Sequence, residues 1–254
     1  MCSIADLITP LSAGAFPGFR AVFTDRVGGV SAAPFDTFNL SYDVGDNPAS
    51  VRRNRALLAR EISVAPDSLF SCKQVHGSDV HVVGAGERLE ARVEADALVS
   101  VEAGVALMVV VADCVPVLII DPERGASAAI HAGRRGLIGG VIPAALAKMT
   151  VAFGSDPLAM RAFIGPCIRK CCYQVDAATA AQFSQVFPDH VVVAHGRAPL
   201  LDMPGATFWA LEQAGVPRDN IEDTGLCTYC LPEAFFSYRR AITTGRQAAV
   251  VVKK

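Results

Sequence analysis

Two side chains on neighbouring apolar runs could bind one metal ion together. Cys114 directly precedes the run 115–120, and His131 ends the run 126–131. The segment between the runs has the composition of a turn, so the two runs predict a β-hairpin. If the loop has two residues, Cys114 and His131 lie directly opposite each other. If it has four, they lie diagonally on the same face of the hairpin, and if it has three, this relation is lost. A cysteine and a histidine on one face suit a cation such as zinc. On composition alone, a buried cysteine beside a core histidine explains the same residues more simply.

The segment 73–81 offers two histidines as a third ligand. His76 and His81 are an odd number of positions apart, so a continuous strand would point them to opposite faces and only one could join the site. His76 is followed by Gly77, where backbone can approach closely, and is the better placed of the two. Three protein ligands leave one tetrahedral position open, which is typical of catalytic zinc.

Apolar periodicity predicts the elements that would hold these side chains. The strand-like runs are residues 20–24, 80–83, 105–111, 115–120, 126–131, 161–164, 191–194 and 248–252. The helical segments are residues 47–61, 137–153, 177–187 and 207–214. Asn47 and Pro48 are typical of a helix start, and Pro143 predicts a kink or a delayed start. No stretch has the composition of a linker, so we expect one mixed α/β domain over residues 1–254.

Composition excludes several classes of protein. Of 254 residues, 52% are hydrophobic and 19% are charged, which excludes a disordered chain. The net charge of −2 argues against a nucleic-acid partner. The first basic residue is Arg20, so no signal peptide is expected, and the apolar stretch 103–120 carries Asp113 and Pro116, which disfavours a membrane span. We therefore expect a cytoplasmic protein whose eight cysteines are reduced.

Short motifs along nearly the whole chain resemble one family. They are residues 24–31, 38–40, 44–46, 74–77, 95–99, 112–117, 131–133, 227–230 and 235–240. In this order they are similar to the multicopper polyphenol oxidase or laccase-domain family, which is also described as a purine nucleoside phosphorylase family. The resemblance implies an α/β fold of mixed sheets flanked by helices, similar to cytotoxic necrotizing factor-like cysteine hydrolases. It also implies a zinc site at His76, Cys114 and His131, with copper as the alternative metal.

The same resemblance implies an activity and substrate contacts. The expected reaction is zinc-dependent phosphorolysis of adenosine, inosine and methylthioadenosine, with adenosine deamination as a second activity, in a monomer or homodimer. Cys114, His131 and Arg135 are the expected catalytic residues, and Asn39, Gln74 and Arg135 the expected substrate contacts. Arg134 and Arg135 precede a helix, where guanidinium and backbone N–H donors could hold phosphate. Arg134 stands where the family usually has tryptophan, which leaves the substrate preference open.

Two other functions use the same residues. Cys114 as nucleophile and His131 as base would make a cysteine hydrolase, such as an amidase acting on a peptidoglycan precursor. A copper-dependent polyphenol oxidase is the other alternative, but multicopper centres need many histidine ligands and this chain has five. A binding protein with a vestigial site fits an open three-ligand centre least.

The remaining cysteines and one acidic residue fit simpler explanations. Cys227 and Cys230 have the Cys-X-X-Cys spacing of half a zinc ribbon or of a redox pair, but no matching second half is evident. Cys167, Cys171 and Cys172 are too close together in the chain to supply an obvious one. We therefore expect ordinary buried thiols here. Asp113 is a candidate acid or base, although strand alternation turns it away from Cys114.

Overall fold

Strands that are buried along almost their whole length form the centre of the molecule. The computed structural model describes residues 16–84, 87, 93–196 and 198–254. Within it, β6 (Val115–Asp121) and β7 (Ala126–Ala132) are buried at every position. β5 (Ala106–Val111) and β12 (Gln247–Lys253) are buried at all positions but one. A strand without an exposed face must be covered on both sides, so these strands lie in inner layers.

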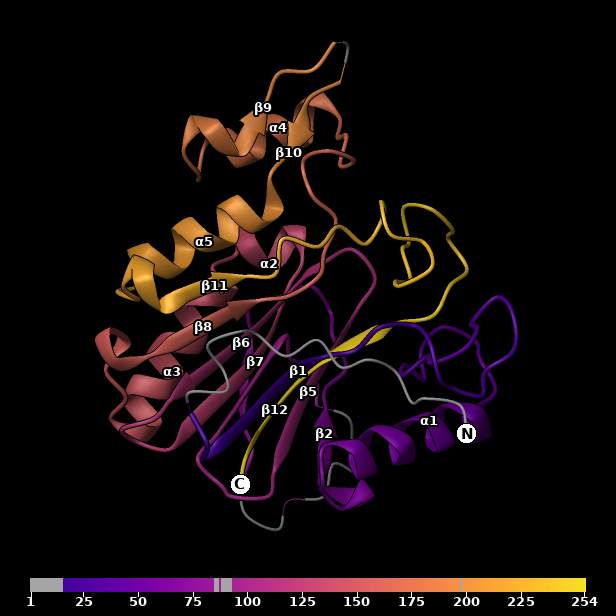
Figure 1. Ribbon diagram of the computed structural model, residues 1–254. Helices are drawn as coiled ribbons and strands as arrows, with labels where there is room; N and C mark the ends of the chain where they lie inside the picture. The colour runs from indigo at the N-terminus through magenta and orange to yellow at the C-terminus, as the bar shows by residue number, and fades with distance from the viewer. Residues whose placement is uncertain (1–15, 85–86, 88–92, 197) are drawn as a thin grey trace.

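Two mixed sheets hold these strands (Figure 1). The first sheet has the order β1 (Phe19–Phe23), β12, β5 and β2 (Leu69–Ser71). The second has the order β11 (Ile221–Asp223), β8 (Arg161–Ile164), β6, β7, β4 (Ala97–Ser100) and β3 (Val80–Val82). A short pair, β9 (Val192–Val193) and β10 (Leu200–Leu201), forms a separate ribbon.

The sheets pack face to face, and helices cover their outer faces. Leu107 of β5 and Leu118 of β6 belong to one apolar cluster between the sheets. Met108, the next residue of β5, packs with Leu58 of α1 (Pro48–Glu61) on the outer face of the first sheet. Ile119 of β6 packs on the opposite side. The helices over that side are α2 (Arg134–Ile138), α3 (Val141–Phe153) and α5 (Met203–Gln213).

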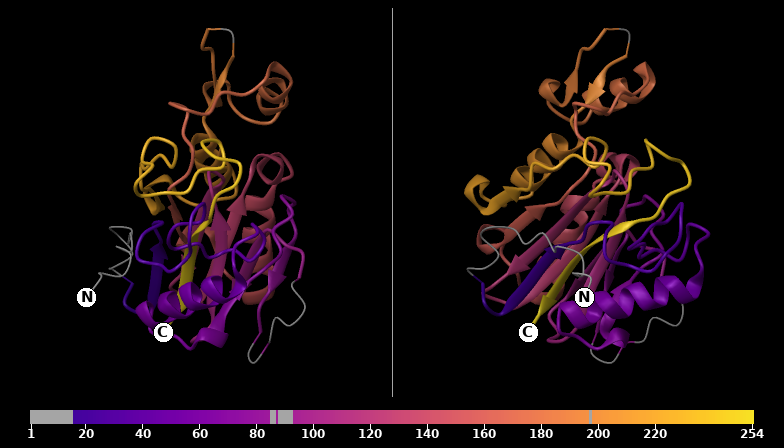
Figure 2. Two further views of the ribbon diagram at one scale, coloured as in Figure 1. Left: turned by 90° about the vertical axis from the view of Figure 1, so that its right-hand side faces the viewer. Right: turned by 45° about the vertical axis from the view of Figure 1, so that its right-hand side comes forward.

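These layers make one α/β domain. The short helix α4 (Ala177–Ser184) and the β9–β10 ribbon project from the top of the molecule (Figure 2). Four 3-10 turns complete the regular elements of the described chain: Pro66–Ser68, Pro157–Ala159, Asp189–Val191 and Arg218–Asn220. No helix in this part of the chain is both long and apolar enough to cross a bilayer. Cys2 and the start of the expected domain lie outside the described residues.

The helix expected over residues 137–153 is two helices. α2 begins at Arg134, and the break lies at Gly139 and Gly140, where Gly140 takes a φ of 80°. Pro143 falls in the first turn of α3, where a missing N–H breaks no helical bond, so it causes no kink. The start of α1 is as expected, because Asn47 accepts a hydrogen bond from the N–H of Ala49 (2.9 Å). The strands β2, β4, β10 and β11 were not expected.

Candidate metal centre

Three separate segments bring His76, Cys114 and His131 together. One ligand atom of each residue lies within 4.8 Å of those of the other two. The Sγ atom of Cys114 is 3.9 Å from Nε2 of His76. The two imidazole rings lie edge to face, with centroids 4.8 Å apart and an interplanar angle of 87°. The three side chains therefore converge on one point.

The hairpin places Cys114 and His131 diagonally. β6 and β7 pair through Asp121 and Ala126, so the connecting loop has four residues, and His131 lies opposite Pro116. Cys114 lies one residue before β6 and two residues before Pro116, which is the partner of His131. The two-residue loop, which would have set Cys114 directly against His131, is not formed. The four-residue alternative keeps both side chains on one face.

Buried Asp96 holds two of the three side chains in place. Its carboxylate accepts hydrogen bonds from the backbone N–H groups of Val75 (3.2 Å), His76 (2.9 Å) and Gly77 (2.6 Å). It also lies 2.7 Å from Nδ1 of His131. A proton on Nδ1 leaves Nε2 of His131 free to bind a metal, and such carboxylate–histidine pairs orient metal ligands. No role of Asp96 was predicted from the sequence, because the strand that it precedes, β4, was not predicted.

Close packing around the centre requires glycine at position 133. A Cβ atom there would lie 2.8 Å from Cδ2 of His76 and 3.4 Å from Sγ of Cys114. The backbone φ of Gly133 is −74°, which any residue can adopt. Lack of space between the side chains, not backbone conformation, therefore explains this glycine.

Electrostatics favour the thiolate form of Cys114. Burial opposes ionisation, but His131 and the hydrogen bonds from His131 and His76 outweigh it and lower the pKa of Cys114 to about 6. Burial also opposes the charge on His131, yet the Cys114 thiolate and Asp96 raise the pKa of His131 to about 9. Without a metal, the pair is a thiolate and an imidazolium at neutral pH. The thiolate is the form that binds metals.

The donor set fits one metal ion. With Zn–S and Zn–N distances of about 2.3 and 2.05 Å, tetrahedral zinc separates a sulfur from a nitrogen by about 3.6 Å. The 3.9 Å between Cys114 and His76 is close to this value. The other histidines are elsewhere: His81 lies 2.7 Å from Glu87, and His190 and His195 are exposed. A multinuclear copper centre therefore lacks ligands in the described chain, whereas a single ion does not.

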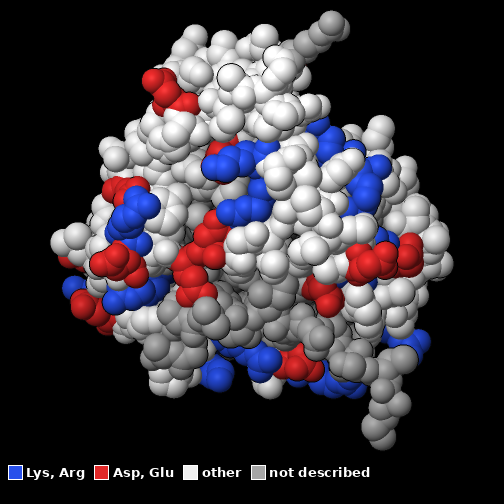
Figure 3. Space-filling view, turned by 45° about the horizontal axis from the view of Figure 1, so that its top comes forward, with Lys and Arg blue, Asp and Glu red and all other residues white. Residues whose placement is uncertain are grey.

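The centre lies in the wall of a cavity of about 590 Å³ that is rich in arginine. Arg134, Arg135, Arg239 and Arg246 line it. When the top of the molecule is tilted forward, Lys and Arg side chains gather in the upper middle of the face (Figure 3). Four guanidinium groups around one cavity make it suited to an anion.

The arginines differ in how firmly their guanidinium groups are held. Arg134 donates to Oγ1 of Thr179 (2.6 Å), and Arg239 donates to the carbonyl of Gln174 (2.8 Å). Among the described residues, Arg135 makes only a long contact of 3.4 Å, with the carbonyl of Val75. Arg240 does not line the cavity, because its guanidinium binds backbone carbonyls of the segment 228–235. Arg135 is therefore the best placed of the two expected phosphate contacts to bind a ligand.

The structure gives Asn39 and Gln74 other partners. Asn39 is fully buried, is not part of the cavity lining, and donates to Asp46 (2.9 Å) while accepting from the N–H of Arg246 (2.9 Å). Gln74 lines the cavity, but both ends of its amide bind the backbone of Val110, each at 2.8 Å. In the described structure both amides hold the cavity walls, and their contact with substrate stays a prediction.

Asp113 connects the metal centre to the C-terminal loops. Its carboxylate accepts from Oγ1 of Thr228 (2.6 Å), Oγ of Ser237 (3.0 Å) and the N–H of Arg239 (2.7 Å). Its backbone has a φ of 90°. With three donors bound, this side chain anchors the cavity wall, and its role as an acid or base stays a prediction.

The expectation that no second pair of cysteines accompanies Cys227 and Cys230 is wrong. Cys171 and Cys172 lie beside them, and the four sulfur atoms are all within 4.8 Å of one another. Nearness in the chain had argued against this pairing, but a turn at residues 170–172 presents both sulfurs to the same side.

Comparison with known proteins gives one consistent family. The family model described as multi-copper polyphenol oxidoreductase laccase matches residues 20–254. The chain is 43% identical over 233 residues to purine nucleoside phosphorylase SCO2081 of Streptomyces coelicolor, a match that covers 90% of this chain and 93% of the relative. It is 33% identical over 251 residues to purine nucleoside phosphorylase YlmD of Geobacillus stearothermophilus, which covers 94% of this chain and 92% of the relative.

Solved structures show the same fold. The protein YfiH of Bacillus licheniformis superposes with a TM-score of 0.93 at 28% identity, over 100% of this chain and 98% of that one. The crystal structure of YlmD from Geobacillus stearothermophilus superposes with a TM-score of 0.89 at 32% identity, over 94% of this chain and 93% of that one.

Proposed function

The chain belongs to the multi-copper polyphenol oxidoreductase laccase family, and from that premise we propose that it is a zinc-dependent purine nucleoside phosphorylase. The proposed substrates are adenosine, inosine and methylthioadenosine, with adenosine deamination as a second activity. The names of the relatives support the nucleoside reaction. The observation that carries the proposal is a single His₂Cys centre and four arginines in the wall of one cavity.

The arginines of the cavity would bind the phosphate that takes part in the reaction. In phosphorolysis a phosphate oxygen attacks C1′ of the ribose, the C1′–N9 bond breaks, and the purine leaves with the electron pair and takes up a proton. Arg135, with Arg134 and Arg239 beside it, would hold the phosphate dianion and aim its oxygen at C1′. Ile168 and Met203, which also line the cavity, offer apolar contacts to the base.

The His₂Cys centre accounts for the metal. His76, Cys114 and His131 would hold zinc, and Asp96, which lies 2.7 Å from Nδ1 of His131, would keep a proton there and leave Nε2 for the ion. When bound, zinc would supply Lewis-acid chemistry, which can polarise a substrate oxygen or activate water for deamination. The thiolate of Cys114 and two neutral imidazoles are the ligand forms that this metal requires.

Product analysis with and without phosphate tests the proposal. We expect purified protein to convert adenosine to adenine and ribose 1-phosphate only when phosphate is present, to form inosine without it, and to lose both activities with a chelator. An Arg135→Ala variant should keep its zinc and need roughly tenfold to a hundredfold more phosphate, since a charge-assisted contact contributes about 1.5–3 kcal/mol. Arg53→Ala, an exposed change on α1, is the matched control. Release of adenine at the same rate without phosphate would contradict phosphorolysis.

One observation favours a cysteine hydrolase as the second candidate. The centre contains the three groups that such an enzyme uses. They are the thiolate of Cys114 as nucleophile, the imidazole of His131 as base, and the carboxylate of Asp96 as the group that orients His131. The likeness to cytotoxic necrotizing factor-like hydrolases, expected from the sequence, stays a prediction. Full activity after the metal is removed, with a covalent substrate adduct on Cys114 in mass spectrometry, would establish this candidate in place of the phosphorylase.

A further inference from the structure

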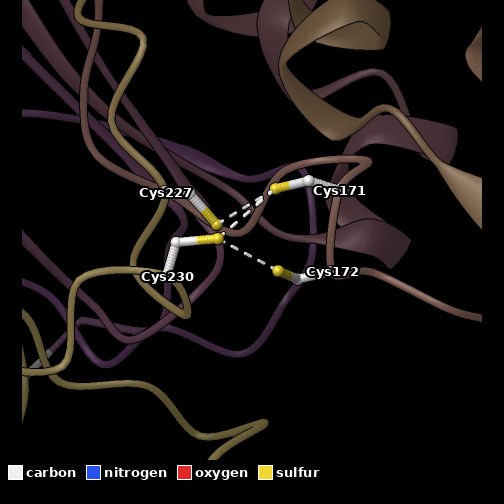
Figure 4. A group of neighbouring side chains, drawn as sticks. All are labelled: Cys171, Cys172, Cys227 and Cys230. Carbon is white, nitrogen blue, oxygen red and sulfur yellow. Dashed lines mark hydrogen bonds between the residues drawn. The ribbon is translucent and has the colours of Figure 1, made fainter.

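Four cysteines from two distant segments meet outside the cavity centre. Figure 4 shows Cys227 and Cys230 on one segment pointing towards Cys171 and Cys172 on another. The Sγ atom of Cys171 is 3.7 Å from that of Cys227 and 3.6 Å from that of Cys230, and the sulfurs of Cys172 and Cys230 are 3.2 Å apart. All four are free thiols. A disulfide would require about 2.05 Å, so no pair is bonded.

The distances are those of thiolates that share one ion. Four sulfurs placed tetrahedrally about 2.3 Å from zinc are about 3.8 Å from one another. The observed separations lie around this value, and none exceeds 4.8 Å. In an iron–sulfur cluster the four cysteines bind two or four irons, which spreads their sulfurs further apart. We propose that Cys171, Cys172, Cys227 and Cys230 form a second metal site, which binds one zinc ion with four thiolates.

The local backbone presents the sulfurs together. Adjacent side chains alternate in an extended strand, but Cys171 and Cys172 lie in a turn, closed by hydrogen bonds from the N–H groups of Cys172 (2.9 Å) and Tyr173 (3.0 Å) to the carbonyl of Arg169. The other pair lies in a turn closed by the N–H of Leu231 on the carbonyl of Cys227 (3.2 Å). Each turn thus directs two sulfurs to the same side.

The surroundings of Cys227 favour a thiolate. Burial opposes its ionisation, but backbone N–H groups of Cys230, Arg169 and Tyr229 lower the pKa of Cys227. Burial and the neighbouring thiols raise the pKa of Cys171 to about 11 and raise that of Cys172 as well, so these two thiols would ionise on binding a cation. Hydrogen bonds from main-chain N–H groups to a ligand sulfur are second contacts of the kind that tune metal sites. Cys171 and Cys230 are exposed, which gives an ion access to the cluster.

Four protein ligands close the coordination sphere, which is typical of a structural zinc site. The ion would join two segments that build the cavity wall. One carries Tyr173, and the other carries Arg239, whose guanidinium lies 4.9 Å from the ring of Tyr173. The second site would thereby fix the position of Arg239 without touching the substrate.

Metal analysis of variants that lack one of the two metal sites tests the proposal without reference to nucleoside turnover. The full chain, purified from zinc-supplemented cells, should contain about two zinc ions, and a Cys172→Ser/Cys230→Ser variant about one. Cys167→Ala is the matched control, because Cys167 is buried and its backbone pairs with Cys227, but it is not one of the four clustered cysteines. This control should keep the wild-type zinc content.

A second measurement covers the case in which the double variant fails to fold. Cys114→Ala leaves the four cysteines intact, so after exchange with Co²⁺ it should show the strong visible bands and sulfur-to-metal charge transfer of a tetrahedral thiolate site. The proposal is wrong if this variant binds no Co²⁺ through sulfur. It is equally wrong if zinc-loaded wild-type protein contains a disulfide among these cysteines, or iron and sulfide. Failure of phosphorolysis alone would leave these readouts unchanged.

Discussion

At the scale of single residues, Asp96 is the side chain on which the candidate centre most depends. It binds His131 and three backbone N–H groups of the His76 loop. Asp96→Asn loses the charge that holds the His131 proton, so we expect metal affinity to fall about 10–100-fold. Zinc titration against a competing chelator measures this. His81→Ala is the control and should leave the affinity unchanged, since His81 binds Glu87 instead. Equal affinity in wild type and Asp96→Asn would show that Asp96 does not support the centre.

The Cys114 thiolate gives a pH signature in metal-stripped protein. Its pKa is lowered to about 6, so the thiolate is present above that pH and is lost as the pH falls through it. The rate of alkylation at Cys114 should therefore be nearly constant from about pH 7 to 8.5 and fall below about pH 6, whereas an ordinary thiol gains reactivity up to about pH 8.5. Mass spectrometry of the modified peptide measures the rate. Zinc should suppress the reaction, and His131→Ala should move the midpoint upwards. A midpoint near pH 8.5 in the metal-stripped wild type would refute the ion pair.

At the scale of elements, Asp113 ties the start of β6 to the C-terminal loops. Asp113→Ala leaves Thr228, Ser237 and the N–H of Arg239 without their acceptor. We expect it to lower the free energy of unfolding by roughly 1–3 kcal/mol and to weaken phosphate binding while zinc is retained. Thr228→Val removes one of the three bonds and should have a smaller effect. Urea unfolding measures the change in stability, and the rate of nucleoside cleavage at increasing phosphate concentration measures the change in phosphate binding. An unchanged phosphate requirement in Asp113→Ala would show that Asp113 does not position Arg239 for phosphate binding.

The sequence predicts the central elements because strong local signals define them. The start of α1 follows from the Asn47 cap, and the hairpin follows from the turn residues between two apolar runs. The hairpin register could not be fixed, because pairing depends on loop length, which the turn composition leaves open. The short strands β2 and β11 have three residues each, and tertiary pairing, not local pattern, makes them strands.

At the scale of the whole molecule, the sites combine residues far apart in the chain. His76 and His131 could be selected from motifs and strand parity, but the support from Asp96 depends on β4 lying beside β7. The cysteine cluster joins residues more than fifty positions apart through two turns, and no periodic pattern encodes such a contact. The full burial of Asn39 could not be predicted for a related reason, since burial depends on the packing of loops that sequence does not give.

Heat stability should report both proposed metal sites, because each would join segments that are distant in sequence. A ligand at a hundred times its dissociation constant stabilises the folded state by about 2.7 kcal/mol, and 1 kcal/mol shifts the Tm of a chain of this size by about 2–4 °C. Removing one zinc should therefore lower the Tm by roughly 5–10 °C. Calorimetry with zinc and with chelator should show the largest shift in wild type. Smaller shifts are expected in Cys114→Ala and in Cys172→Ser/Cys230→Ser, since each retains one site. If Cys114→Ala shows no zinc-dependent shift, the ion bound by the four cysteines does not stabilise the fold. If Cys172→Ser/Cys230→Ser shows no zinc-dependent shift in Tm, the ion bound by the His₂Cys centre does not stabilise the fold.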